Sequence, residues 1–265
     1  AYAKERAQFG KKIINFPAVY DMLSRMKAKL DAGRSILYQT ARYVDIYKAL
    51  EDIARDRTLT PEERKEMKLY SRLADAFTPL AKGMNSEYAN QNAYDAISVH
   101  GGSGFIMEYK CQRLFRDARI FSIYEGTTQL QVVAAIRYVT NGTYLGIIKE
   151  MLEKEVAPEF QALKERVAKM VEKYEDAINY VKAAGNNDLH DFLARRLYEM
   201  TAEIIMSLLI LDDATRAPEL FAKSANVYVR YAEGTVAGHY AYIKEFKAED
   251  LADFLAAAPE EAPAE

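Results

Sequence analysis

The chain has very little cysteine, with the single residue Cys111 among 265. An internal disulfide is therefore impossible, and we expect a reducing, cytoplasmic setting rather than a disulfide-stapled secreted domain. Long apolar runs are also lacking, since none approaches the roughly 18 residues that cross a bilayer. No signal peptide is visible. The sequence thus predicts a globular chain with no membrane span.

An excess of charge of one sign is lacking too. The 36 basic and 39 acidic residues leave a net charge of −3 and are interspersed, which argues against nucleic acid as the main partner. The three histidines, His100, His190 and His239, are too far apart in the sequence to predict a zinc site. Half of the residues are apolar, as in ordinary globular proteins that bury a sizeable core.

What the sequence does contain is helical periodicity nearly throughout. One helix is predicted to start near Pro17. A second is predicted over Pro61–His100, with Thr60–Glu63 as its capped start. A third is predicted over Thr128–Thr140, and three amphipathic stretches follow it, separated by short breaks. No alternating run predicts a sheet, so the predicted fold class is all-α: an up-and-down helical bundle followed by a second helical subdomain.

The first nine residues read as the middle of a helix without an N-cap, and the chain has no initiator Met. We therefore expect Ala1 to be an internal boundary of a longer protein. The predicted organisation is one helical domain over 1–145, a second over 146–250, and a flexible Ala/Pro/Glu-rich tail over 251–265.

A carboxylate stands just before a predicted helix in the tetrapeptide Tyr124-Glu125-Gly126-Thr127. The positive end of the helix dipole favours an anion there. A carboxylate from which a bound substrate excludes water is suited to abstracting a proton. The same four residues are also good turn-and-cap chemistry, so a purely structural role is the alternative.

Two further segments contain residue types suited to a nucleotide. Gly101-Gly102-Ser103-Gly104 is a turn in which backbone amides can approach a phosphate, or else only a connection. Arg6-Ala7-Gln8-Phe9-Gly10-Lys11 offers a guanidinium for pyrophosphate, an amide for a phosphate or ribose oxygen, and an aromatic face for adenine. Its structural alternative is a helix C-terminus, with Gly10 as the stop and Arg6 as a solvated charge.

In their order along the chain, 6–11, 101–104 and 124–127, the three segments resemble the C-terminal helical domain of the acyl-CoA dehydrogenases, flavoproteins that oxidise acyl-CoA thioesters. The resemblance covers residues 1 to about 145 and includes Arg116-Asp117-Ala118-Arg119. The stretch 77–82 and the helices after 145 resemble the extended members, which have an additional C-terminal helical domain. The family subunit also has an N-terminal helical domain and a β-domain that holds the flavin ring, and this chain is expected to lack both.

The resemblance implies α,β-dehydrogenation of an acyl-CoA. Glu125 would remove the α-proton, FAD would accept the β-hydrogen, and an electron-transferring flavoprotein would take the electrons. Further residues match positions that touch the cofactor or the substrate in the family: for FAD, Arg6, Gln8, Phe9, Ser98, Gly101, Gly102, Thr127 and Gln129; for acyl-CoA, Tyr124, Gly126 and Arg137. Ser98 stands where the family often has the longer Gln, and Phe16-Pro17 stand where it often has His-Gln.

The resemblance also bears on assembly. In the family, the segment matched by Arg6–Lys11 contacts the FAD of a neighbouring subunit, which implies a homo-oligomer, either a dimer or a tetramer. Arg116, Asp117 and Arg119 are predicted to form an ion-pair network that fixes the Glu125 loop. The fragment alone is expected to be inactive. The alternative function is a non-catalytic helical module for interaction or oligomerisation.

Overall fold

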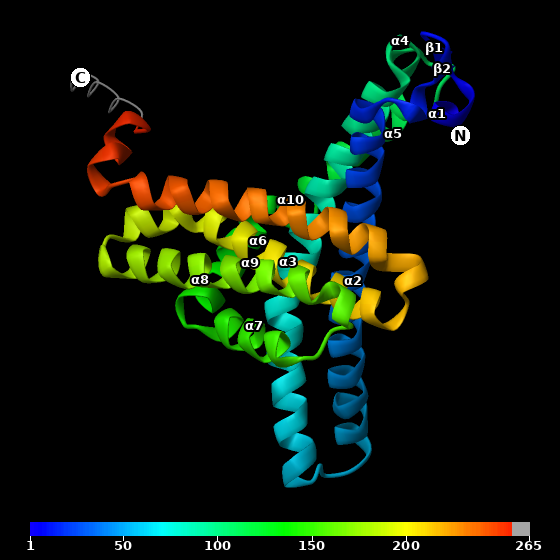
Figure 1. Cartoon of the computed structure of the whole chain (residues 1–265). Coiled ribbons are helices and arrows are strands. Elements are labelled where there is room, and N and C mark those ends of the chain that lie inside the picture. The colour runs from blue at the N-terminus through cyan, green and yellow to red at the C-terminus, as the bar shows by residue number, and fades with distance from the viewer. Residues whose placement is uncertain (256–265) are drawn as a thin grey trace, which may run out of the picture.

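The structure is a computed structural model that describes residues 1–255. Helices make up nearly all of it, which confirms the predicted all-α fold class (Figure 1). Of the predicted tail, residues 256–265 lie outside the described part. The elements follow one another in this order: α1 Tyr2–Glu5, β1 Ala7–Gln8, β2 Lys11–Lys12, η1 Ile13–Asn15, α2 Pro17–Asp56, α3 Pro61–His100, α4 Gly102–Phe105, α5 Cys111–Ala118, η2 Arg119–Ser122, α6 Thr128–Thr140, α7 Thr143–Glu153, η3 Pro158–Phe160, α8 Gln161–Ala183, α9 Asn187–Arg216, α10 Pro218–Glu245 and η4 Ala248–Asp253.

The long helices α2 and α3 form an antiparallel pair (Figure 1). The predicted start of α3 is confirmed by a capping box: Glu63 N donates to Thr60 Oγ1 at 3.2 Å, and Thr60 N donates to Glu63 Oε2 at 2.8 Å. The two helices approach closely at Gly33, where Asn85 Nδ2 of α3 donates to the Gly33 carbonyl at 3.1 Å. A Cβ on Gly33 would lie 2.2 Å from Asn85 Oδ1, so this contact requires glycine.

The prediction of a helix through the first nine residues is wrong. Helix α1 ends at Glu5, and the strands β1 and β2 form a two-residue antiparallel hairpin. Its turn consists of Phe9 with φ 47° and Gly10 with φ 77°. Two consecutive residues with positive φ match the twist of a tight hairpin. Phe9 adopts the strained conformation, and the glycine meets the second requirement without cost.

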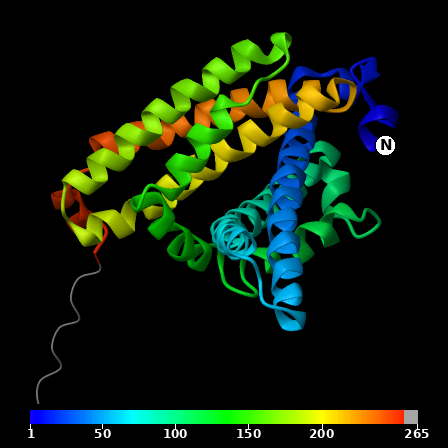
Figure 2. The ribbon, with the colours of Figure 1, turned by 90° about the horizontal axis from the view of Figure 1, so that it is seen from below.

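Three long helices, α8, α9 and α10, lie across the α2–α3 pair (Figures 1 and 2). These helices confirm the three predicted amphipathic stretches. Asn186 caps α9 by accepting a hydrogen bond from Leu189 N at 2.9 Å. Residues 200–211 of α9 are all buried, because other helices surround this segment, and most of its residues are apolar.

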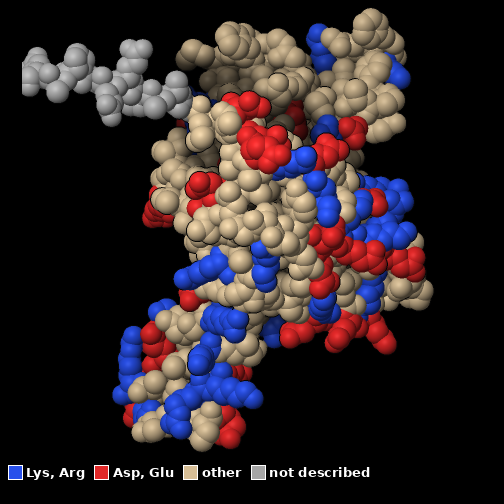
Figure 3. Space-filling view, turned by 90° about the vertical axis from the view of Figure 1, so that its left-hand side faces the viewer, with Lys and Arg blue, Asp and Glu red and all other residues tan. Residues whose placement is uncertain are grey.

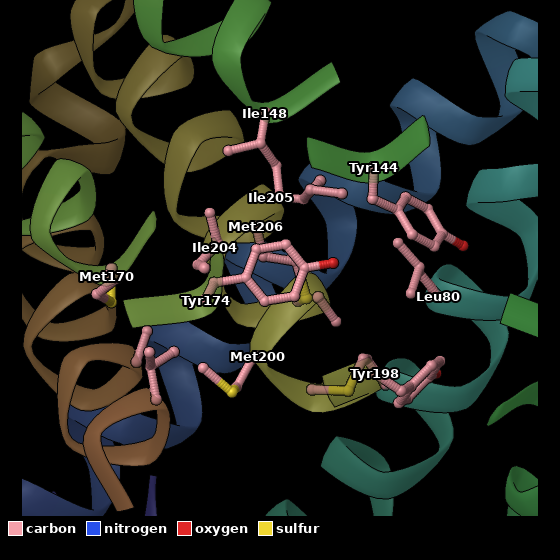
Figure 4. Close-up of a cluster of buried hydrophobic side chains, with 14 of the residues drawn as sticks. Leu80, Tyr144, Ile148, Met170, Tyr174, Tyr198, Met200, Ile204, Ile205 and Met206 are labelled. Atoms are coloured by element: carbon pink, nitrogen blue, oxygen red, sulfur yellow. The ribbon is translucent and has the colours of Figure 1, made fainter. Parts of the chain in front are cut away.

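One continuous hydrophobic core joins the first part of the chain to the second. Side chains of α3, α7, α8 and α9 meet in it (Figure 4). Two buried tyrosines reach the backbone of α3: Tyr144 Oη donates to Ala76 O at 2.5 Å, and Tyr198 Oη donates to Pro79 O at 2.9 Å. Pro79 removes one N–H from the middle of α3, and both hydroxyls bond the helix backbone within three residues of that position.

A buried polar cluster lies between the α2–α3 pair and helices α9 and α10. Glu203 is 2% exposed, and its carboxylate accepts a hydrogen bond from Tyr88 Oη at 2.7 Å. The Tyr228 hydroxyl lies 2.9 Å from that of Tyr88. Burial raises the pKa of Glu203 to about 7. Burial also lowers the pKa of Lys29, whose ammonium lies 4.5 Å from the centre of the Tyr231 ring.

Packing of α9 on α3 is expected to depend on Gly83. A Cβ at this position would lie 2.1 Å from Tyr198 Oη, and the tyrosine is buried and hydrogen-bonded. Gly83→Ala should therefore lower the free energy of unfolding by roughly 1–3 kcal/mol. The matched control is Gly146→Ala in α7, where nothing lies within 4 Å of the added Cβ; it should raise stability by roughly 0.5–1 kcal/mol. Equal effects in urea denaturation would show that the α3–α9 contact is not tight.

Glu203 should make stability fall as pH rises. The pKa of Glu203 is raised from 4.5 to about 7 in the folded protein, so the unfolded chain releases this proton first. The free energy of unfolding should fall between about pH 4.5 and 7, by an amount on the order of 3 kcal/mol for this group. Glu203→Gln should remove that part of the slope, whereas Glu172→Gln, at an exposed position of α8, should keep it. Identical slopes in the two variants would contradict the assignment.

Candidate active site

The loop between η2 and α6 holds Glu125 in an unusual backbone conformation. Glu125 has φ 49° and Gly126 has φ 89°. The left-handed region disfavours a residue with a Cβ, and such strain persists where surrounding contacts fix it, often at functional sites. Thr127 then caps α6 by accepting a hydrogen bond from Leu130 N at 3.3 Å. The carboxylate is thus placed at the start of a helix, as the sequence predicts.

Two side chains hold the backbone of this loop. Lys82 of α3 donates from Nζ to Phe121 O at 2.9 Å and to Gly126 O at 2.6 Å. The Gly126 carbonyl also accepts a hydrogen bond from Gln131 Nε2 at 3.2 Å. Glycine is favoured at 126 by its positive φ, and a Cβ there would also lie 2.8 Å from the Gln131 amide and displace it.

Glu125 lines a pocket of about 470 Å³ between the loop and the α2–α3 pair. Hydroxyl groups in its wall are already engaged: Thr40, Thr78 and Ser86 each donate to the carbonyl four residues earlier in their own helix. The wall therefore offers mainly apolar surface, and the charged groups that line the pocket are Glu125 and Lys82. The lining is Leu37, Thr40, Thr78, Ala81, Lys82, Asn85, Ser86, Ala89, Phe121, Tyr124 and Glu125.

A second pocket, of about 350 Å³, brings together the two segments predicted to contact a nucleotide. From the start of the chain it contains Arg6 and Gln8, and from the end of α3 it contains Ser98, Gly101 and Gly102. A Cβ on either glycine would meet nothing within 4 Å, so the backbone is open to a ligand there. A guanidinium and an amide beside open backbone are donors suited to a pyrophosphate, whereas the Ser98 hydroxyl donates to Tyr94 O at 3.3 Å.

The other predicted site residues lie outside the lining of these two pockets. Phe9 is at the hairpin tip and is 93% exposed. Thr127 caps α6, and Gln129 lies in its first turn. Arg137 is near the other end of α6, where its guanidinium bonds to Tyr138 Oη at 2.8 Å and lies over that ring.

The predicted ion-pair network before the loop is wrong. Arg116 and Asp117 form a single exposed pair at 3.8 Å. Arg119 instead donates to Ser122 Oγ within η2. An exposed pair at this distance contributes little to stability, so the loop depends on Lys82 and Gln131 rather than on that charge cluster. The sequence contained no local signal for Lys82, because its partners lie 39 and 44 residues away.

The face shown in Figure 3 carries charges of both signs. On the face shown in Figure 3, Lys and Arg side chains are mixed with Asp and Glu rather than gathered in one patch. Within residues 1–255, no group of His, Cys, Asp and Glu is placed to hold a metal ion. In the same range, no helix is long and apolar enough to cross a membrane.

Comparison with known protein families identifies both parts of the chain. Residues 1–139 match the family model described as "Acyl-CoA dehydrogenase, C-terminal domain", and residues 140–251 match "Acyl-CoA dehydrogenase C terminal". The first match covers more than half of the chain. The chain therefore belongs to the acyl-CoA dehydrogenase family, as the resemblance indicated.

Curated relatives match about half of the chain. The caffeyl-CoA reductase-Etf complex subunit CarC of Acetobacterium woodii is 37% identical over 130 residues, which is 49% of this chain and 28% of that protein. The 3-methylmercaptopropionyl-CoA dehydrogenase of Ruegeria pomeroyi is 34% identical, over 49% of this chain and 22% of its own length. The chain thus spans less than a third of these relatives.

A solved structure matches almost the whole chain. An acyl-CoA dehydrogenase from Bacillus anthracis, complexed with FAD, superposes with a TM-score of 0.69 at 21% identity. The match covers 96% of this chain and 46% of that one. Helices α7–α10 are therefore part of a fold already observed together with the family's C-terminal helical domain.

Proposed function

We propose that this chain is the C-terminal part of an FAD-dependent acyl-CoA dehydrogenase, with Glu125 as the base that removes the α-proton of an acyl-CoA thioester. The observation that carries the proposal is the position of Glu125: a carboxylate in a left-handed turn, on the edge of an apolar pocket of about 470 Å³. Tyr124, in the same pocket, would lie along the acyl thioester. An apolar pocket suits the acyl chain, and its one carboxylate suits removal of a proton from the α-carbon beside the thioester carbonyl.

The residues at the second pocket fit the nucleotide part of FAD. Arg6 would pair with the pyrophosphate, and Gln8 and Ser98 would bond to phosphate or ribose oxygens beside the open backbone at Gly101 and Gly102. Bound FAD would supply the acceptor for the β-hydrogen. Thr127 and Gln129 are proposed as further cofactor contacts, and Gly126 and Arg137 as substrate contacts. This assignment rests on the donors that the two segments bring together.

The chain presents apolar surface that the rest of such an enzyme would cover. Tyr124 is 46% exposed beside the pocket, and Phe105 and Met107 are 83% and 86% exposed near the second one. An exposed pocket cannot exclude water from a carboxylate. We therefore infer that residues 1–265 alone neither retain FAD nor oxidise acyl-CoA. Phe9, at the tip of the hairpin, is proposed to contact a neighbouring subunit of a homo-oligomer.

An electron-transferring flavoprotein is proposed as the redox partner, since the relative CarC is named as part of a complex with Etf. The direction of the reaction is not fixed by these residues. By microscopic reversibility, Glu125 would return the proton to the α-carbon if the whole enzyme worked as a reductase. The alternative of a non-catalytic helical module predicts a colourless full-length protein after FAD is added.

Arg6 is expected to matter for flavin retention. In the full-length protein, Arg6→Ala removes the guanidinium from the second pocket, at a cost typical of a charged hydrogen bond of about 1.5–3 kcal/mol. Flavin affinity should therefore fall by at least about tenfold. Lys4→Ala is the control, since it removes an equal charge at an exposed position that does not line this pocket. Equal flavin content in the two variants, measured by absorbance, would exclude Arg6 from the cofactor site.

Glu125→Gln should abolish proton abstraction in the full-length protein while flavin and acyl-CoA still bind. The amide preserves the size of the side chain but cannot accept a carbon-bound proton. The rate of flavin bleaching on anaerobic mixing with acyl-CoA should fall by about 10²–10⁴-fold or more. Glu125→Asp should recover part of the rate, because the carboxylate is retained but withdrawn by one methylene.

The matched control for this experiment is Glu108→Gln, which removes a carboxylate from an exposed position outside both pockets. It should leave the bleaching rate unchanged. If Glu125→Gln bleaches the flavin as fast as Glu108→Gln, another group is the base and the proposed role of Glu125 is wrong.

A further inference from the structure

One lysine connects the candidate catalytic loop to the helix that forms the wall of its pocket. Lys82 lies one turn after Pro79 in α3. Its ammonium bonds to the carbonyl of Phe121, before Glu125, and to the carbonyl of Gly126, directly after it. The same ammonium lies 5.6 Å from the centre of the Tyr124 ring. A single cation thus touches the loop on both sides of Glu125.

The partners of Lys82 are unusual for a lysine. Within the described residues, no carboxylate lies within 4.0 Å of its ammonium. Its donors bond instead to two backbone carbonyls, one in η2 and one in the loop that follows it. Hydrogen bonds from a charged donor are stronger than neutral ones, and the loop needs such support because Glu125 has a positive φ.

The second side chain that bonds the loop reaches it only after Glu125. Gln131 of α6 donates to Gly126 O, and the start of α6 is joined to α3 by a hydrogen bond from Thr128 Oγ1 to Glu87 Oε1 at 2.6 Å. Neither bond reaches the backbone before Glu125. Lys82 belongs to α3, together with Ala81 and Ser86 of the pocket wall. Because a side chain of the wall helix bonds the backbone both before and after Glu125, Lys82 is placed to fix Glu125 relative to the pocket.

We propose that Lys82 is a positioning residue: it selects the loop conformation in which Glu125 faces the pocket, and it acts on the reaction only through Glu125. The proposal rests on the proposed function of Glu125. According to this proposal, the conformation of residues 121–126 depends on a side chain of α3. The same helix forms part of the wall of the substrate pocket.

The test compares three variants of the flavin-loaded full-length enzyme. Lys82→Met keeps the aliphatic stem and removes the donors. Lys82→Arg keeps the charge and several donors. Lys68→Met removes a lysine from an exposed position of the same helix and serves as the control. The readouts are the rate of flavin reduction per bound flavin at saturating acyl-CoA, the KM for acyl-CoA, and hydrogen–deuterium exchange of the amides of 121–127.

Lys82→Met removes two charge-assisted hydrogen bonds. The rate of flavin reduction should fall by at least about tenfold, the change expected from the loss of even one of them. The KM should change much less, because the pocket wall remains. Exchange in 121–127 should become faster, with no change in α8–α10. Lys82→Arg should recover most of the rate, and Lys68→Met should match the wild type in every readout.

The proposal is overturned if Lys82→Met and Lys68→Met have equal rates and equal exchange, or if Lys82→Arg is as slow as Lys82→Met. If Lys82→Met loses its helical circular dichroism, Lys82→Gln, which keeps a neutral donor, takes its place with the same expected order. Exchange of 121–127 reports on Lys82 even if Glu125 is not the base. Failure of this proposal is thereby distinguishable from failure of the proposed function.

Discussion

The hydrogen bond from the buried Tyr198 hydroxyl to the Pro79 carbonyl supports the segment of α3 on which the candidate site depends. Proline in a helix interior removes a backbone hydrogen bond and favours a kink. Here Tyr144 and Tyr198 reach the backbone at 76 and 79, and Gly83 leaves the space that Tyr198 occupies. Both tyrosines belong to residues 140–251, which match the second family model. These residues therefore stabilise α3, the helix that forms part of the pocket wall.

Helix α3 connects the two pockets. Thr78, Lys82 and Ser86 face the pocket of Glu125, and Ser98 lies at the end of the helix beside the second pocket. A continuous helix fixes the distance between such positions at about 1.5 Å per residue. A substrate held against Glu125 and a cofactor held at Ser98 would therefore be placed relative to each other by one rigid element. A change in the geometry of α3 should therefore alter the positions of lining residues in both pockets.

The helices could be predicted from the sequence because the signals for them are local. The capping box at Thr60 and Glu63 and the cap at Asn186 each involve residues three apart, and both are present in the structure. The hairpin at Phe9 was missed, because a non-glycine residue with positive φ has no clear sequence signal.

The candidate site was predictable only in part. Glu125 and Tyr124 were found through their resemblance to a family, and the structure places both on one pocket. Lys82 was not found, since a lysine in a helix usually faces solvent and its partners here are distant in the sequence. The predicted network of Arg116, Asp117 and Arg119 is wrong, because charge spacing along the chain does not determine which side chains meet in space.

Exchange of the substrate α-proton with deuterated solvent tests the role of Glu125 most directly. The full-length enzyme would be mixed with an acyl-CoA analogue that binds but cannot lose its β-hydrogen, and deuterium at the α-carbon would be followed by NMR. The account predicts rapid exchange in the wild type and in Glu108→Gln, and exchange slower by at least about 10²-fold in Glu125→Gln. Equal exchange in all three proteins would show that the α-proton is removed by another group and would contradict the central claim.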